Sequence, residues 1–152
     1  MLRAERIAPA GDWPRDRARG TVTLAYDDRH RRRLRLESDA GEPFLLDLPR
    51  ADVLEDGDGV ALSDGSWFLV RAAAENLLEI TAATPALLAR LAWHLGNRHL
   101  PAQIAGDRIF IRNDHVIAHM LEGLGARLKR IAAPFTPERG AYDGEGRHHH
   151  EH

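Results

Sequence analysis

The histidines are the residues of this sequence best suited to chemistry: there are nine in a chain of 152 residues that has no cysteine. Imidazole is the commonest protein ligand for borderline divalent metals such as nickel, copper and zinc. Because thiolate ligands are excluded, a transition-metal site must use imidazole, carboxylate, backbone or water, which favours exchangeable binding over a closed structural zinc site. The candidate ligands fall into a central and a C-terminal group: His94, His99, His115 and His119, then His148, His149, His150 and His152.

His115 and His119 are four residues apart on a predicted helix, and this spacing places both imidazoles on one face. The spacing is equally compatible with two ordinary surface histidines. The metalloprotease motif H-E-x-x-H uses the same spacing, but Val116 stands where that motif needs its general-base glutamate. Asp114 is interpreted as the N-cap of this helix, in preference to a metal ligand or a group that orients a histidine.

His99 follows Gly96-Asn97-Arg98 in a loop after an earlier predicted helix. A histidine at this position can bind a metal or cap the last helix carbonyls with its ring. His94 lies one turn earlier and is better explained as a half-buried residue packed beside Trp93. The C-terminal histidines have the look of a purification tag, but Glu151 interrupts them and no linker precedes them, so we interpret them as native.

Composition indicates a folded protein that carries no global attraction to nucleic acid or to an anionic membrane. The hydrophobic content is 43% and the formal net charge is −2. The N-terminus lacks the apolar core of a signal peptide, and no run approaches the ~20 apolar residues of a membrane span, so we expect a cytoplasmic protein. The run Arg31-Arg32-Arg33, with Arg29 and Arg35 beside it, is interpreted as the solvated face of an exposed strand.

The first half of the chain predicts an all-β domain over residues 1–74. Polar and apolar residues alternate at residues 21–26 and 33–37, and the segment between them, 27–30, has the composition of a turn. Further short apolar runs are separated by turns rich in aspartate and glycine. Strands at this spacing are typical of a small sandwich or barrel.

The second half predicts a ferredoxin-like β-α-β-β-α-β domain over residues 75–135. A helix begins after the capping residue Thr84 and is expected to stop at Gly96, and a second helix runs from Asp114 to Gly125. Residues 136–152, rich in glycine and charge, are expected to form a mobile histidine-containing tail. The overall fold class is therefore α+β. The expected buried face of the second helix consists of Val116, Ile117, Met120, Leu121 and Leu124.

Several of these segments together resemble one family, the UreE urease accessory proteins, which are nickel metallochaperones. The resemblance covers residues from about 20 to 135. In the second half it depends on Trp93-His94-Leu95-Gly96-Asn97-Arg98-His99, on Asp114-His115-Val116-Ile117, and on Met120-Leu121 and Leu124-Gly125. In the first half it depends on residues 26–33, Leu48-Pro49-Arg50 and residues 54–58.

The resemblance implies a β-rich N-terminal domain that docks peptides or partner proteins and a C-terminal domain that binds metal and forms a homodimer. His99 matches the principal ligand of the family, which meets its symmetry mate at the dimer interface, and His115 matches an accessory histidine. The tail matches a variable histidine-rich extension. His119 is outside the family motif, and Asn113 stands where some members carry another histidine.

The expected function is therefore a nickel carrier and not an enzyme. Ni²⁺ is the expected ion, with Cu²⁺ and Zn²⁺ also binding in vitro. The resemblance implies two recipients, the GTPase UreG and the urease apoprotein maturation complex, and no nucleic-acid or membrane partner. Two alternatives are a zinc-dependent hydrolase using His99, His115 and His119, and a non-metal binding module built on the ferredoxin-like domain.

Overall fold

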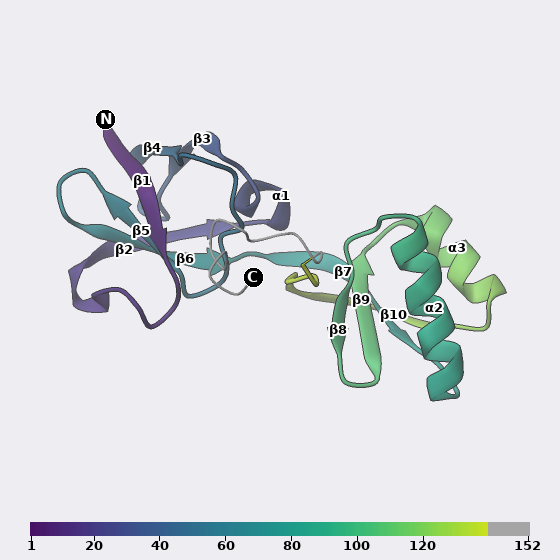
Figure 1. Ribbon diagram of the computed structural model, residues 1–152. Coiled ribbons are helices and arrows are strands. Elements are labelled where there is room, and N and C mark those ends of the chain that lie inside the picture. Colours follow the sequence, from purple (N-terminus) through teal and green to yellow (C-terminus); the bar gives the residue numbers. More distant parts are fainter. Residues whose placement is uncertain (140–152) are drawn as a thin grey trace. The chain divides into compact units, whose positions relative to one another are not determined.

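The computed structural model describes residues 1–139 of the chain, and it confirms the α+β fold class. The chain divides into two compact units, one formed by residues 1–73 and the other beginning at Ala74. Each unit is built around its own sheet (Figure 1). The predicted ligands His148, His149, His150 and His152 lie outside the described residues. Within residues 1–139, no helix is long and apolar enough to cross a membrane.

The N-terminal unit is a mixed, six-stranded sheet in the order β2-β6-β5-β1-β4-β3. Two pairs of neighbouring strands are parallel: β2 with β6 at one edge of the sheet, and β1 with β4 in its interior. The remaining neighbours are antiparallel. Its core is formed by the apolar residues that alternate toward one side of the curled sheet, with Phe44 and Phe68 in ring contact at its centre. The elements are β1 (Leu2–Ala8), a 3-10 turn η1 (Arg15–Arg17), β2 (Ala18–Leu24), α1 (Tyr26–Arg29), β3 (Arg33–Glu37), β4 (Pro43–Asp47), β5 (Gly59–Leu62) and β6 (Trp67–Ala72).

Asp39, which follows β3, links the two edge strands of the six-stranded sheet, β3 and β2. The N–H of Asp39 donates to the carbonyl of Thr21 (2.9 Å), and its carboxylate accepts from the N–H of Thr23 (3.1 Å) and from both threonine hydroxyls. The hydrogen bond from Thr21, followed by those from Thr23, lowers the pKa of Asp39 below its ordinary value. One side chain therefore helps to curl the sheet.

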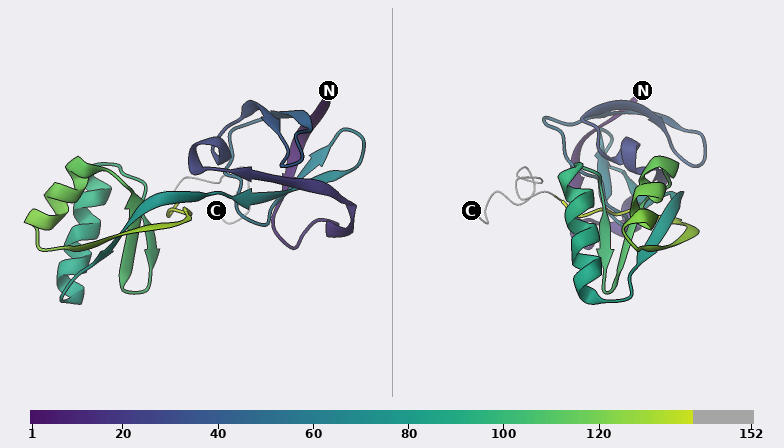
Figure 2. Two further views of the ribbon diagram at one scale, coloured as in Figure 1. Left: turned by 180° about the vertical axis from the view of Figure 1, so that it is seen from behind. Right: turned by 90° about the vertical axis from the view of Figure 1, so that its right-hand side faces the viewer.

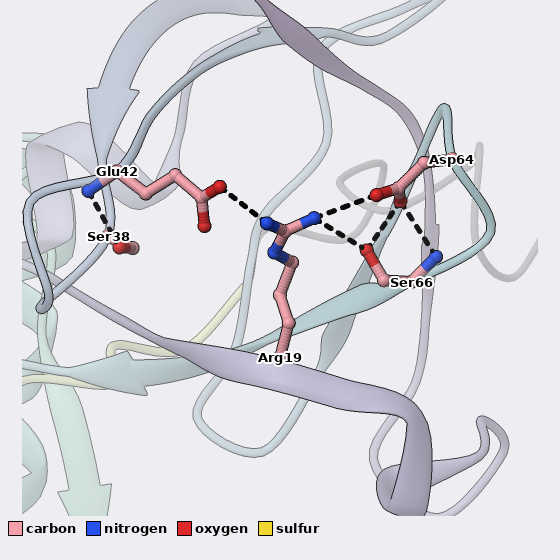
Figure 3. A network of polar contacts seen from close by, with 5 residues as sticks. All are labelled: Arg19, Ser38, Glu42, Asp64 and Ser66. Carbon is pink, nitrogen blue, oxygen red and sulfur yellow. Dashed lines mark hydrogen bonds and ion pairs between the residues drawn. The ribbon is translucent and has the colours of Figure 1, made fainter.

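A second polar network ties β2 to two turns of the same unit (Figure 3). The guanidinium of Arg19 forms ion pairs with Glu42 (2.5 Å), in the turn between β3 and β4, and with Asp64 (2.7 Å), in the turn between β5 and β6. Asp64 also accepts from the N–H and hydroxyl of Ser66, and the hydroxyl bond is the main reason why the pKa of Asp64 is lowered. Because every group in the network has a local partner, we assign it a structural role.

Arg29 departs from its predicted place on a solvated arginine face, because its side chain is fully buried (0% exposed). Its Nε donates to the carbonyl of Leu24 (3.1 Å) and a terminal nitrogen donates to the carbonyl of Leu54 (3.3 Å). The guanidinium also lies over the ring of Tyr26. These bonds explain why residues expected to form a turn instead form the short helix α1. Arg33 and Arg35 are exposed on the outer strand β3, as expected.

The C-terminal unit has the predicted β-α-β-β-α-β order, and its antiparallel sheet has the strand order β10-β7-β9-β8. Both helices cover one face of this sheet (Figure 2). The hydroxyl of Thr84 caps the first helix by accepting from the N–H of Leu87 (3.1 Å), and Pro85 occupies the first helical position. The elements are β7 (Ala74–Thr81), α2 (Pro85–Asn97), β8 (Gln103–Ala105), β9 (Arg108–Arg112), α3 (His115–Gly123) and β10 (Arg127–Pro134).

The core of the C-terminal unit lies between the helices and the sheet. Leu91 and Leu95 of α2 and Ile117 and Leu121 of α3 are buried there, and the burial of Ile117 and Leu121 agrees with the face predicted from the sequence. Val116 was expected on the same buried face, but it is 61% exposed. The reason is geometric: Val116 is one residue, or about 100°, away from Ile117 around the helix.

Phe135 and residues 136–138 pack against the C-terminal unit, although the tail was expected to begin at residue 136. Phe135 is fully buried, and the backbone N–H groups of Thr136 and Glu138 donate to Gln103 and Ala102. A single apolar residue after Pro134 gave no periodic pattern, so sequence reasoning missed this contact.

Candidate metal centre

His99 lies at the point where α2 ends and the chain reverses. The N–H of His99 donates to the carbonyl of Gly96 (3.0 Å), and the N–H of Leu100 donates to the carbonyl of Leu95 (3.2 Å). This pair of bonds is the Schellman motif, which satisfies carbonyls at a helix C-terminus. The helix therefore continues through Gly96, which was expected to stop it, and ends at Asn97.

The backbone of His99 is left-handed, with φ 58°, and among residues 1–139 it is the only non-glycine residue with a positive φ. The second helix provides an internal comparison. The N–H groups of Gly125 and Ala126 close the same motif on α3, and the residue in the equivalent position is Gly125, with φ 97°. A side chain in this conformation costs about 1–2 kcal/mol that glycine does not incur. His99 thus occupies a position that the backbone favours for glycine.

His115 is the first residue of α3, and Asp114 is confirmed as its N-cap. One carboxylate oxygen of Asp114 accepts from the N–H of Val116 (2.9 Å) and from that of Ile117 (3.1 Å). These bonds fix the start of α3 and hence the position of His115. His119 follows one turn later, and both histidines are exposed.

Residues from the two histidine-bearing segments line one pocket of about 340 Å³. Leu100, the residue after His99, and Asp114, the residue before His115, both line it. The remaining lining is partly apolar, from Pro101, Ile111 and Ile117, and partly polar, from Arg112 and Asn113. The C-terminal end of α2 and the N-terminal end of α3 are therefore neighbours.

His94 is half-buried, and its ring meets that of Trp93 edge to face with a centroid distance of 5.1 Å. The predicted packing role of His94 is confirmed. Trp93 itself is 63% exposed on the last turns of α2. An exposed tryptophan next to the histidine segment is a feature that the sequence pattern did not single out.

Among the described histidines, His99, His115 and His119 are exposed and His94 is half-buried. In residues 1–139, no three histidine or carboxylate side chains are gathered as a set that could hold one metal ion. Each exposed imidazole can supply one nitrogen ligand when it is neutral. Leu100 and Asp114, the residues next to His99 and His115, line one pocket, so the segments that carry these two histidines are neighbours.

The fold and the site define a two-domain protein in which a β-rich unit precedes a ferredoxin-like unit with exposed imidazoles at neighbouring helix ends. Family models match both units: that of the UreE urease accessory protein N-terminal domain matches residues 4–73, and that of the C-terminal domain matches residues 75–152. The chain belongs to the family of UreE urease accessory proteins.

Individual relatives agree with this assignment along the whole chain. The urease accessory protein UreE of Beijerinckia indica is 52% identical over 152 residues, which cover 100% of this chain and 87% of the relative. That of Bradyrhizobium sp. (strain ORS 278) is 54% identical over 93% of this chain and 67% of the relative. That of Agrobacterium fabrum is 49% identical over 99% of this chain and 93% of the relative. The role of the chain is thus in urease maturation, as an accessory chaperone and not as an enzyme.

Proposed function

We propose that this chain is a nickel carrier that holds Ni²⁺ between two copies of His99 in a homodimer. A two-fold axis converts one histidine per chain into a pair of ligands facing each other. His115, water and the tail histidines His148, His149, His150 and His152 would complete the coordination, and His119 is a further donor on the same helix face. An incompletely enclosed ion suits a carrier, because a recipient can remove it by ligand exchange.

The observation that carries this proposal is the left-handed backbone of the exposed His99. Backbone strain of this kind clusters at functional sites, where the surrounding structure maintains it. The His99 side chain is exposed there, so burial in the core does not account for the strain. A ligand presented at a chain reversal, free to meet a symmetry mate, does account for it.

Two exposed apolar side chains beside the histidine segments support the homodimer. Trp93, on α2, is 63% exposed and Val116, next to His115, is 61% exposed. Large apolar side chains that remain exposed in one chain are typical of surfaces that are buried on association. Burying them between two copies would bring the ends of α2, and with them the two His99 side chains, toward a common axis.

The recipients in this proposal are the GTPase UreG and the urease apoprotein maturation complex, reached in the cytoplasm. The support is the membership in a urease accessory family. A nickel carrier of that family would have to pass its metal to the proteins that assemble urease. The N-terminal domain would dock these partners. A pocket of about 180 Å³, lined on one side by Glu5 to Ile7 of β1 and on the other by Leu48 to Arg50 and Asp52, offers a place for an extended segment.

The proposal is tested by nickel calorimetry on His99→Ala, with His30→Ala as the matched control. His30 is also exposed, but it lies in the other domain. We expect His99→Ala to lose the tight nickel site while its circular dichroism is unchanged, and His30→Ala to bind as the parent chain does. Unchanged tight binding in His99→Ala would contradict the proposal.

A further inference from the structure

The strand β10 is the longest outer strand of the two sheets, and one of its edges is open. Its eight residues pair with β7 along their whole length without a break in register (Figure 1). Among residues 1–139, no hydrogen bond reaches β10 from any segment other than β7. The other outer strands are shorter and are tied at one end: β2 and the end of β3 are joined through Asp39, and Gln103 of β8 accepts from the N–H of Thr136.

One hydrogen bond between β7 and the end of β9 fixes which backbone groups face the open edge. The N–H of Asn113 donates to the carbonyl of Asn76 (2.9 Å), so the backbone groups of Asn76 point toward β9. Successive residues of a strand point these groups to opposite sides, so those of Leu77 point toward β10, where Ile131 is its partner. By the same alternation, three residues of β10 turn their N–H and C=O groups to the open side: Leu128, Arg130 and Ala132.

Positive charge lies along the same edge. Arg127, Lys129 and Arg130 are exposed, and β10 contains no acidic residue. Within residues 1–139, none of these three cations forms an ion pair. The carboxylate aligned with Lys129 in the register is that of Glu79, and it pairs with Arg108 instead (3.1 Å). The edge therefore combines open backbone groups with cations that have no acidic partner.

These charges decide which strand can pair with the edge. Basic side chains on an outer strand oppose pairing between two copies of one chain, because like charges then meet across the new ladder. A strand that carries carboxylates opposite the same side chains is attracted, and the same charges thus reject one partner and select another. Charge complementarity favours an acidic segment of a different protein over a second copy of β10.

We propose that β10 is a docking edge for an extended acidic segment of a partner protein, which adds a fifth strand to the four-stranded C-terminal sheet. The backbone ladder supplies affinity and the side chains supply specificity. Arg127 and Lys129 lie on one face of the strand and Arg130 on the other. A parallel segment should thus carry acidic residues at the first, third and fourth of four successive positions, and an antiparallel segment at the first, second and fourth. The inference uses no histidine and is independent of the nickel proposal.

The test is a binding measurement with the fluorescent peptide Thr-Val-Glu-Val-Glu-Glu-Val-Glu-Val-Thr, which contains both patterns, titrated with the full chain at low ionic strength. We expect the double variant Arg127→Glu, Lys129→Glu to raise the Kd about tenfold and to prefer the peptide in which lysine replaces each glutamate. The matched control is Arg33→Glu, Arg35→Glu, the same change of charge on the outer strand β3, and it should bind as the parent chain does. Equal binding by the parent chain and the β10 variant would overturn the inference.

Hydrogen exchange separates a backbone ladder from a purely electrostatic contact. Saturating peptide should slow amide exchange about tenfold at Leu128, Arg130 and Ala132, and should leave the amides of β3 unchanged. Binding that leaves the three β10 amides unprotected would contradict strand addition. Protection of these amides in the free chain that is lost on dilution would show that a second copy occupies the edge, which also overturns the inference.

Discussion

At the scale of single residues, His99 combines a functional side chain with a backbone that prefers glycine. Replacing His99 with glycine should therefore raise the free energy of unfolding by about 1 kcal/mol, because the left-handed strain is relieved. Urea unfolding checks the stability, and calorimetry checks that tight nickel binding is lost. His99→Ala should lose the nickel without gaining stability, and a glycine variant no more stable than the alanine variant would count against the strain.

Gly125 is the matched control for this prediction, since it closes the same motif on α3 with no metal role. Gly125→Ala should lower the free energy of unfolding by about 1 kcal/mol. An added Cβ would meet Leu87 at 3.5 Å, an ordinary contact, so backbone strain alone should set the effect. Nickel affinity should be unchanged when calorimetry is performed on the folded variant.

Asp114 tests whether a carboxylate near the site acts on the helix or on the metal. Asp114→Ala should cost about 1 kcal/mol of stability through loss of the N-cap, and Asp114→Ser should recover most of this. Nickel affinity should change little in the serine variant, because the cap again fixes the start of α3. A serine variant that is stable but has lost tight nickel would show that Asp114 serves the metal directly.

The sequence allowed His99 and Asp114 to be selected as candidates, but it did not predict the backbone conformation of His99. His99 could be selected from its type and its place after a helix, and Asp114 from its place before one. The left-handed backbone of His99 could not be predicted, because Gly96 is a more usual residue for the end of a helix. Nor did the sequence show that Leu100 and Asp114 share a pocket, which depends on the packing of α2 against α3.

At the scale of elements, Asp39 should make the N-terminal sheet sensitive to acid. Its pKa is lowered in the folded chain, chiefly by the hydroxyl of Thr21, so its stabilising effect is complete above the ordinary value of 3.8 and is lost as the pH falls through the folded value. Asp39→Asn should thus be less stable than the parent chain at pH 7, and the difference should shrink at pH 3. Urea unfolding at both pH values, monitored by tryptophan fluorescence, measures this difference in the free energy of unfolding. A difference that is the same at pH 7 and pH 3 would exclude the carboxylate as its cause.

The elements that sequence reasoning missed have local physical causes. The first strand, β1, was not predicted, because the register shifts between Ala4 and Arg6 and the alternation of polar and apolar residues changes phase there. The short helix α1 depends on the buried guanidinium of Arg29, which donates to the carbonyl of Leu24 just before the helix and to that of Leu54, 25 residues away. Neither cause can be seen in a pattern of neighbouring residues.

At the scale of the whole molecule, the C-terminal unit was predictable because its helices and strands alternate with clear caps and a short hairpin. The strand order β10-β7-β9-β8 follows from that sequence of elements. For the N-terminal unit, the sequence predicted only that the fold is all-β, not the order or pairing of its strands. Its parallel pairs, β1 with β4 and β2 with β6, join segments far apart in the chain, and no local signal specifies such pairing.

The measurement that tests the account most directly is a nickel titration on a chain that ends at Arg147, with the mass of the same sample determined by light scattering. This chain retains His99 and His115 and lacks the four C-terminal histidines. The account predicts a dimer that binds tightly about one Ni²⁺ per two chains. A monomer would contradict the site shared between two chains, and the loss of all tight binding would contradict the role of His99 and place the metal chemistry in the tail.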